Sequence, residues 1–287
     1  MFNLIRMNLY RMAHAKSIKI ILLIMSLFAM LNVYMCVSEI DAYTEQDIQS
    51  MYEQQSEGAF EFDSDKVEMN FGIAVNPPVT ESGVKLTGLG NYTTDLASCI
   101  MLVFVTIAVS LFFNSEEKSG FVKNVAGQVR YKCNIYFSKV IVMAIYLLIS
   151  FVLYFLADVA AVALFADATF VMADGDIKDY IILIGIQFIL NLAYVSGVGL
   201  LATLTRSNAA TISLGLLFSM GFSAIAANFI YVISDMNISK YLVVCNIKSV
   251  VLGAGNKILV MAVVVGFIYT IVYNVIGSLW FTKRDVV

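Results

Sequence analysis

The sequence predicts an all-α polytopic membrane protein with six transmembrane helices. Six apolar runs follow one another along the 287-residue chain: 17–38, 94–114, 139–165, 179–204, 208–234 and 257–281. Each run is long enough to cross a hydrocarbon core of about 30 Å at about 1.5 Å per helical residue. The composition agrees, since 60% of the residues are hydrophobic and only 14% are charged. The mean hydropathy is +0.84, which is typical of a chain that lies largely in lipid.

The distribution of lysine and arginine predicts which side of the membrane each connection faces. Basic residues gather in the N-terminal segment, in the 115–138 connection, at the 205–208 turn and near the C-terminus. The 39–93 segment and the other connections hold nearly all of the carboxylates. Because basic residues are retained on the cytoplasmic side, both termini and Cys133 are expected to be cytoplasmic, and Cys245 external. The net charge of −3 averages these two faces and gives no indication of nucleic-acid binding.

Residues 1–16 are expected to form a helix that lies in the cytoplasmic membrane interface. Its apolar face would consist of Phe2, Ile5, Leu9 and Met12, with the basic residues elsewhere on the helix. The alternative is a continuous extension of the first span. The 17–38 run is too long for the apolar region of a signal peptide and has no small-residue cleavage site, so it is expected to be retained.

The 39–93 segment is an extracellular, strongly acidic connection. Ile40–Gly58 is expected to be helical, and the remainder, with Gly88 and Gly90, is expected to form turns and short strands. Asp63–Ser64–Asp65 is a fragment of the kind that binds a cation. No complete calcium-loop spacing follows it, so a solvated acidic cap is the favoured interpretation.

The sequence lacks the common catalytic and metal-binding motifs. It has no P-loop, no H-E-x-x-H and no G-x-S-x-G, and His14 is its only histidine. Four scattered cysteines without a C-x-x-C spacing are expected to be free thiols. A disulfide between Cys36 and Cys99 remains an alternative, because both lie near the outer ends of their spans. We expect no metal site, no cofactor bound by this chain and no enzymatic activity of its own.

A few polar residues lie within the predicted spans. An intramembrane carboxylate is a candidate for a functional role, and Asp158 is the clearest case here. The run that contains Asp158 is longer than the membrane requires, so a position at the outer interface is favoured. The remaining polar residues are expected to form hydrogen bonds between helices, with a transport pathway as the alternative: Gln187, Asn191, Asn228 and Asn274. Four glycines are expected to let spans four and five approach closely: Gly197, Gly199, Gly215 and Gly221.

The most informative motif lies in the 115–138 connection. It reads Glu116–Glu117–Lys118–Ser119–Gly120–Phe121–Val122–Lys123–Asn124–Val125–Ala126–Gly127–Gln128–Val129–Arg130 and is followed by Tyr136–Phe137–Ser138–Lys139. This order of acidic residue, glycine, Lys-Asn pair, glycine and arginine before a Y-x-S-K entry resembles the cytoplasmic loop of type-2 ABC exporter permeases. The short Arg206–Ser207 turn and the moderately apolar 235–256 connection, which in that family forms short helices, extend the resemblance over nearly the whole chain. The length of the 39–93 segment departs from compact members of the family.

The resemblance implies a permease subunit in a bacterial cell membrane that exports a peptide-, drug- or lipid-like substrate. A separate cytoplasmic ATPase subunit would bind ATP-Mg, and a second permease chain, identical or a sister, would complete the path. The residues that the resemblance places in the ATPase-coupling loop are Glu116, Glu117, Gly120, Phe121, Val122, Lys123, Val125, Gly127 and Arg130. In this role Phe121, Val122 and Val125 would supply apolar anchors, and Lys123 and Arg130 peripheral contacts. The alternative is a basic amphipathic loop that rests on anionic lipid.

Two other functional classes remain open. A membrane sensor or assembly protein would use the acidic outer segment to bind a ligand without transporting it. An ion-coupled transporter would place charged or broken-helix sites near the middle of the membrane, and the nearly uncharged spans argue against it.

Overall fold

The chain is a helical membrane protein. The computed structural model describes residues 1–39, 79–80, 83–84, 86–118, 129, 131–166, 171–173, 176–234, 236 and 238–283. Within these residues, four single helices are long and apolar enough to cross a membrane, and two further pairs of bent helices each have the length of one span. The described part therefore contains four to six candidate membrane-spanning helices.

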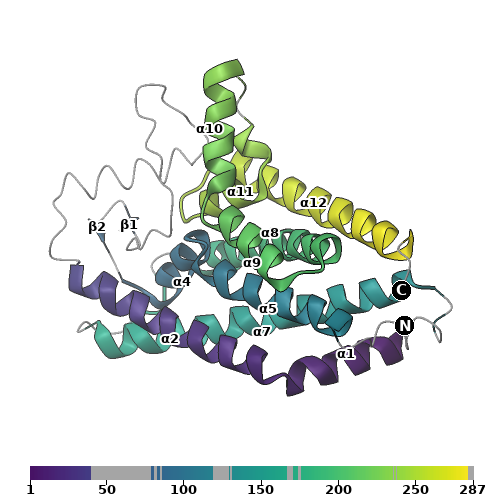
Figure 1. The fold of residues 1–287 in the computed structure, drawn as a ribbon. Helices are drawn as coiled ribbons and strands as arrows, with labels where there is room; N and C mark the ends of the chain where they lie inside the picture. The colour runs from purple at the N-terminus through teal and green to yellow at the C-terminus, as the bar shows by residue number, and fades with distance from the viewer. Residues whose placement is uncertain are drawn as a thin grey trace.

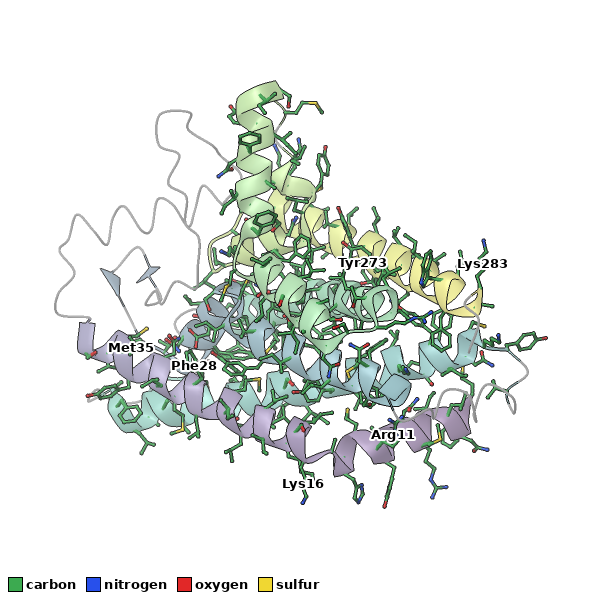
Figure 2. All side chains as sticks on the ribbon, in the orientation of Figure 1. Arg11, Lys16, Phe28, Met35, Tyr273 and Lys283 are labelled. Carbon is green, nitrogen blue, oxygen red and sulfur yellow. The ribbon has the colours of Figure 1, made fainter. Side chains whose placement is uncertain are left out.

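The long helices form one bundle, with the start of the chain and the end of the last helix at the same end (Figure 1). The single spanning helices are α2 (Lys16–Glu39), α7 (Cys133–Phe165), α8 (Ile177–Thr205) and α12 (Asn256–Lys283). Helices α2 and α7 lie side by side, and α8 packs against α12. Of these four helices, α8 is the most buried. Figure 2 shows Met35 at one end of the bundle, and Arg11 and Lys283 at the other.

The first helix, α1 (Phe2–His14), is separate from α2. Ala15 has an extended backbone, with φ −70° and ψ 111°, and this conformation ends α1. The chain therefore bends before the first span, as expected for an interfacial helix. Met12 is buried, whereas Phe2 on the same predicted face is 79% exposed.

Two of the predicted apolar runs are broken in the structure. Helices α4 (Gly88–Ala97) and α5 (Ile100–Lys118) meet at an angle of 59°, and α9 (Asn208–Ser219) and α10 (Phe222–Ser234) meet at 57°. Cys99 has φ 65° at the first break, and Gly221 has φ 100° at the second. A left-handed residue cannot continue a right-handed helix, so the helix changes direction at each of these positions.

Gly88 and Gly90 begin a helix, and the prediction that they lie in turns is wrong. The Oγ1 atom of Thr87 accepts a hydrogen bond from Gly90 N at 3.0 Å, which satisfies one of the free backbone donors at the start of α4. The connection after α7 covers this end, because Gly88 N and Leu89 N donate to Val171 O and Met172 O. Burial against these neighbours holds two glycines in a helix that they would otherwise disfavour.

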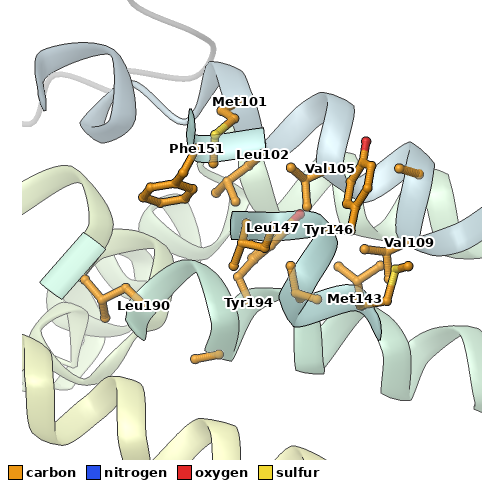
Figure 3. Packing of buried hydrophobic residues seen from close by; sticks show 14 of the residues in the cluster. Met101, Leu102, Val105, Val109, Met143, Tyr146, Leu147, Phe151, Leu190 and Tyr194 are labelled. Carbon is orange, nitrogen blue, oxygen red and sulfur yellow. The ribbon is translucent and has the colours of Figure 1, made fainter. Parts of the chain in front are cut away.

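The core lies where α5, α7 and α8 meet, and Figure 3 shows this packing at close range. Its labelled members are Met101, Leu102, Val105, Val109, Met143, Tyr146, Leu147, Phe151, Leu190 and Tyr194. Large apolar side chains are also exposed along the outer faces of α2 and α12, for example Leu23 at 63% and Ile271 at 61%. Lipid tails provide an apolar environment for such faces, in agreement with a membrane protein.

The prediction that glycines let spans four and five approach holds for Gly215 of α9, whose backbone oxygen accepts a hydrogen bond from Tyr194 OH of α8 at 2.7 Å. Other glycines of the set face other neighbours. A Cβ atom at Gly197 would meet the ring of Tyr273 in α12, and one at Gly199 would meet the ring of Phe113 in α5. A Cβ atom at Gly215 in α9 would lie 2.5 Å from Thr106 Cγ2 of α5. These glycines therefore allow α8 and α9 to approach α5 and α12, while Gly221 forms the break between α9 and α10.

The shorter elements lie in the connections. Strands β1 (Val79–Thr80) and β2 (Gly83–Val84) pair antiparallel. The 3-10 helix η2 (Ser239–Tyr241) and α11 (Val243–Ser249) lie in the 235–256 connection. The predicted helix over Ile40–Gly58 lies outside the described residues, as does Asp63–Asp65.

Candidate functional site

The predicted coupling loop leaves the bundle at the end of α5 and returns at the start of α7. Glu116 and Glu117 belong to the last turn of α5, and their side chains lie outside the described part. The other predicted loop residues also lie outside it: Gly120, Phe121, Val122, Lys123, Val125, Gly127 and Arg130. Val129 packs, partly buried, against the hydrophobic core, so the chain is again in contact with the bundle two residues before Tyr131.

Helix α1 connects the two helices between which this loop runs. Asn8 is almost fully buried and donates a hydrogen bond from Nδ2 to Ser138 Oγ of α7 at 3.0 Å. Arg11 donates from Nη2 to Ser115 Oγ of α5 at 3.3 Å, and from Nη1 to Asn8 Oδ1 at 3.3 Å. Helix α1 is therefore bonded to α5 just before the loop and to α7 just after it.

Lys139 adds a further contact at this end of the bundle. Its side chain is only 2% exposed. Its Nζ donates to the backbone oxygen of Phe113 in α5 at 3.3 Å and lies over the rings of Phe113 and Phe281. Helices α5, α7 and α12 therefore meet around one ammonium group, and such contacts between a cation and aromatic rings are stabilising when desolvated.

Three of the four predicted intramembrane amides form hydrogen bonds between or within helices. Gln187 donates from Nε2 to Ile247 O at 2.8 Å and to Val250 O at 3.0 Å, which holds α11 against α8. Asn191 donates to Gln187 O at 2.8 Å within α8. Asn274 donates to Ser196 Oγ at 3.0 Å and so joins α12 to α8. The predicted hydrogen bonds between helices are confirmed for Gln187 and Asn274, whereas those of Asn191 stay within α8.

The fourth amide, Asn228, differs from the others. It lies in α10, is partly buried, and its Oδ1 has no hydrogen-bond partner in the described residues. The described structure indicates neither a pathway nor a packing role for this residue.

Asp158 is fully buried rather than exposed at an interface. It lies in α7, and its polar neighbours are Asp95 and Asn91 of α4. Helix α4 packs against α7, which removes Asp158 from the surface. Asp158 therefore belongs to a buried polar cluster, and its predicted depth at the outer interface stays a prediction.

Asp95 is the member of this cluster that the sequence interpretation missed. It is 2% exposed and accepts hydrogen bonds from Asn32 Nδ2 at 2.5 Å and from Tyr154 OH at 3.2 Å. In the sequence it appeared at the polar edge of the second apolar run. The signal that could have identified it is its spacing of four residues from Asn91, which places both side chains on one face of a helix.

The described residues contain no group of three or more histidine, cysteine or acidic side chains that could hold a metal ion. Cys99, Cys133 and Cys245 are free thiols, which confirms the prediction for these three cysteines.

The exposure of the cysteines determines how the predicted orientation can be tested. Cys245 is 3% exposed, and burial raises the pKa of its thiol to about 11. Because maleimides react with the thiolate, the native Cys245 is expected to stay unlabelled on either side of the membrane. A chain without its native cysteines, carrying Met236→Cys or Phe2→Cys, provides exposed probes, since these positions are 63% and 79% exposed.

With these probes, an impermeant maleimide on intact cells is expected to label the cysteine at 236 and to spare the cysteine at 2. Both positions should be labelled after permeabilisation. The reverse pattern in intact cells would show that the orientation derived from lysine and arginine is wrong.

The comparisons with known proteins add no relative: no protein-family model matches the chain, and no curated protein matches it.

Proposed function

We propose that this chain is the membrane-spanning permease subunit of an ATP-driven exporter. It would move a peptide-, drug- or lipid-like substrate outward, with energy from a separate ATPase subunit that binds ATP-Mg. The second half of the transport path would come from another permease chain. Support comes from the residues of the 116–130 and 136–139 segments, which resemble the coupling loop of type-2 ABC exporter permeases.

The observation that carries the proposal is the connection of α1 to both sides of the coupling loop. Asn8 bonds to Ser138 in α7, and Arg11 bonds to Ser115 in α5. A displacement of the loop by an ATPase would therefore act on three helices together. Buried Lys139 extends the same unit to α12 through its contact with Phe281.

Coupling requires that the loop contact differ between the two states of the ATPase, because a ligand shifts a conformational equilibrium only through its differential affinity. In the proposed mechanism, Phe121 and Val122 lie in a groove of the ATPase. Closure of the ATPase on ATP would then pull the ends of α5 and α7, and α1 would keep these ends in a fixed relation. The spans would respond as a packed unit because their cores interdigitate.

Substitutions in the loop test this proposal. Phe121→Ala or Val122→Asp is expected to release the ATPase from the purified complex, or to leave ATP hydrolysis without export. Lys123→Ala is the matched control and should have a smaller effect, because exposed charge pairs usually contribute less than about 1 kcal/mol while a buried anchor contributes about 2 kcal/mol or more. The measurements are co-purification of the ATPase and export from cells or vesicles.

All three variants should insert normally, since the changes lie between spans. If both apolar substitutions leave ATPase co-purification and export at the wild-type level, the loop does not dock. A loss of membrane association in place of ATPase association would favour the anionic-lipid interpretation.

A further inference from the structure

A buried polar cluster lies where α2, α4 and α7 meet, away from the coupling loop. Its members are Asn32 of α2, Asn91 and Asp95 of α4, and Tyr154 and Asp158 of α7, and each is at most 2% exposed. Asn32 lies one helical turn before Met35 in α2, and Figure 2 shows Met35 at the end of the bundle opposite Arg11 and Lys283. Five polar side chains are therefore removed from solvent within a helical membrane protein.

The charges of this cluster are not compensated by protein groups. Asp95 accepts hydrogen bonds from Asn32 Nδ2 and Tyr154 OH, and both donors are neutral. Neither Asp95 nor Asp158 forms an ion pair with a lysine, arginine or histidine of the described residues. The other titratable groups that face the two carboxyls are the phenols of Tyr92 and Tyr154. The cluster thus combines two acids with no basic side chain.

Asp95 and Asn91 lie beside Asp158, yet several polar atoms of the cluster have no partner among the described residues at ordinary hydrogen-bond geometry. These atoms are both carboxylate oxygens of Asp158, both amide atoms of Asn91, and Oδ1 of Asn32. Buried polar groups are almost always partnered, so a group of five such atoms at one place requires an explanation. A purely structural network would satisfy its members, and this network does not.

The two acids of the cluster favour a positively charged ligand. Two carboxyl groups that share a dry site cannot both stay ionised unless a cation lies between them. A water molecule could satisfy the amide atoms, but it would leave both negative charges in place. A calcium ion takes about six to eight oxygen ligands, more than the four unpartnered oxygens here offer.

We propose that Asp95, Asp158 and the amides of Asn91 and Asn32 form a binding site for one small monovalent cation, either H⁺ or Na⁺. As a proton site, one carboxyl donates an O–H hydrogen bond to the other. As a sodium site, the Asp158 oxygens and the amide oxygens coordinate the ion, as carboxylates and carbonyls do in other membrane proteins. Occupancy joins α2, α4 and α7. The site does not depend on the proposed export function, since no ATPase contributes to it.

The test uses the full chain, with any protein that co-purifies, in detergent micelles. Its melting temperature is compared in sodium chloride and in choline chloride at equal ionic strength, between about pH 5 and about pH 8. If the occupant is a proton, the melting temperature is highest at low pH and falls as the pH rises, because the shared proton leaves. If the occupant is sodium, sodium chloride restores the melting temperature at high pH and choline chloride does not. A shift of about 2–4 °C or more is expected in either case.

Asp158→Asn is expected to abolish the response to pH or Na⁺, because the neutral amide removes the second charge while keeping the shape. Asp176→Asn is the matched control: Asp176 is an exposed N-cap residue of α8, and asparagine also caps helices, so the wild-type response should remain. A wild-type response in the Asp158→Asn chain would overturn the proposal.

Infrared spectroscopy of the wild-type chain provides a test that does not depend on the folding of a variant. A carbonyl band of a protonated, buried carboxylic acid at neutral pH identifies H⁺ as the occupant. Loss of such a band on addition of sodium chloride, or its absence together with stabilisation by Na⁺, identifies Na⁺. Absence of the band together with a melting temperature insensitive to both pH and Na⁺ overturns the proposal.

Discussion

Replacement of Gln187 by methionine is expected to destabilise the contact between α8 and α11 strongly. The Gln187 Nε2 atom donates to two carbonyl oxygens, those of Ile247 and Val250, at the end of α11. The last carbonyls of a helix have no partner within it, and this side chain supplies the donor. Each carbonyl left buried without a donor is expected to cost about 1–3 kcal/mol. Methionine keeps the volume, so the loss isolates the hydrogen bonds.

The free energy of unfolding in mixed detergent micelles measures this effect, and hydrogen exchange over 243–252 localises it. Ile182→Met is the matched control, since this side chain lies in the same helix and is 53% exposed. The control should change the unfolding free energy by less than about 0.5 kcal/mol. A Gln187→Met chain as stable as the control would show that other contacts hold α11 in place.

Replacement of Gly277 by alanine is expected to be the most disruptive single-methyl change in the part of the chain that the structure describes. A Cβ atom at this position in α12 would overlap the ring of Tyr136, with Cζ at 2.5 Å and Cε2 at 2.9 Å and the hydroxyl closer still. Tyr136 is fully buried and lies against the rings of Phe113 and Phe281, so it cannot move away without displacing them. Overpacking of this kind costs about 1–3 kcal/mol, even though alanine favours the helix by about 0.5–1 kcal/mol.

Gly185 provides the matched control within α8. No heavy atom lies within 4 Å of a Cβ atom added there, so Gly185→Ala should stabilise the chain by up to about 1 kcal/mol. Tyr136→Phe should rescue part of the loss in the Gly277→Ala chain, because the tyrosine hydroxyl makes the closest approach. Thermal unfolding of the wild-type chain, the Gly277→Ala chain, the Tyr136→Phe chain and the chain with both changes measures the coupling between Gly277 and Tyr136. Equal stability of the Gly277→Ala and Gly185→Ala chains would contradict the packing of α7 against α12.

The helix breaks show where a sequence interpretation reaches its limit. Beyond Asp95 the run 94–114 is largely apolar and gives no indication that α5 begins only at Ile100. The break depends on the positive φ of Cys99, a conformation that a cysteine rarely adopts alone. Surrounding contacts hold this residue in place, since its side chain is 1% exposed. The sequence analysis assigned Gly221 to close helix packing. The order of residues could not show that the helix changes direction at this glycine.

The buried acids show the same limit for the candidate sites. Asp158 was identified from its position within an apolar run, but its partner Asp95 lies 63 residues earlier and near a polar boundary. Lys139 was identified only as the last residue of the Y-x-S-K entry to the third span. Its burial depends on the rings of Phe113 and Phe281, which come from two other helices.

The sequence by itself determined that this is a helical membrane protein, because a run of about 20 apolar residues must satisfy its backbone internally when it lies in lipid. It also predicted a separate N-terminal helix and the hydrogen-bonding role of Gln187, since both follow from local patterns of polarity. Only the tertiary structure decided which helices break, which neighbours the glycines face and which acid meets Asp158. Those features depend on contacts between residues far apart in the chain, and periodicity along one helix carries no information about the helix packed against it.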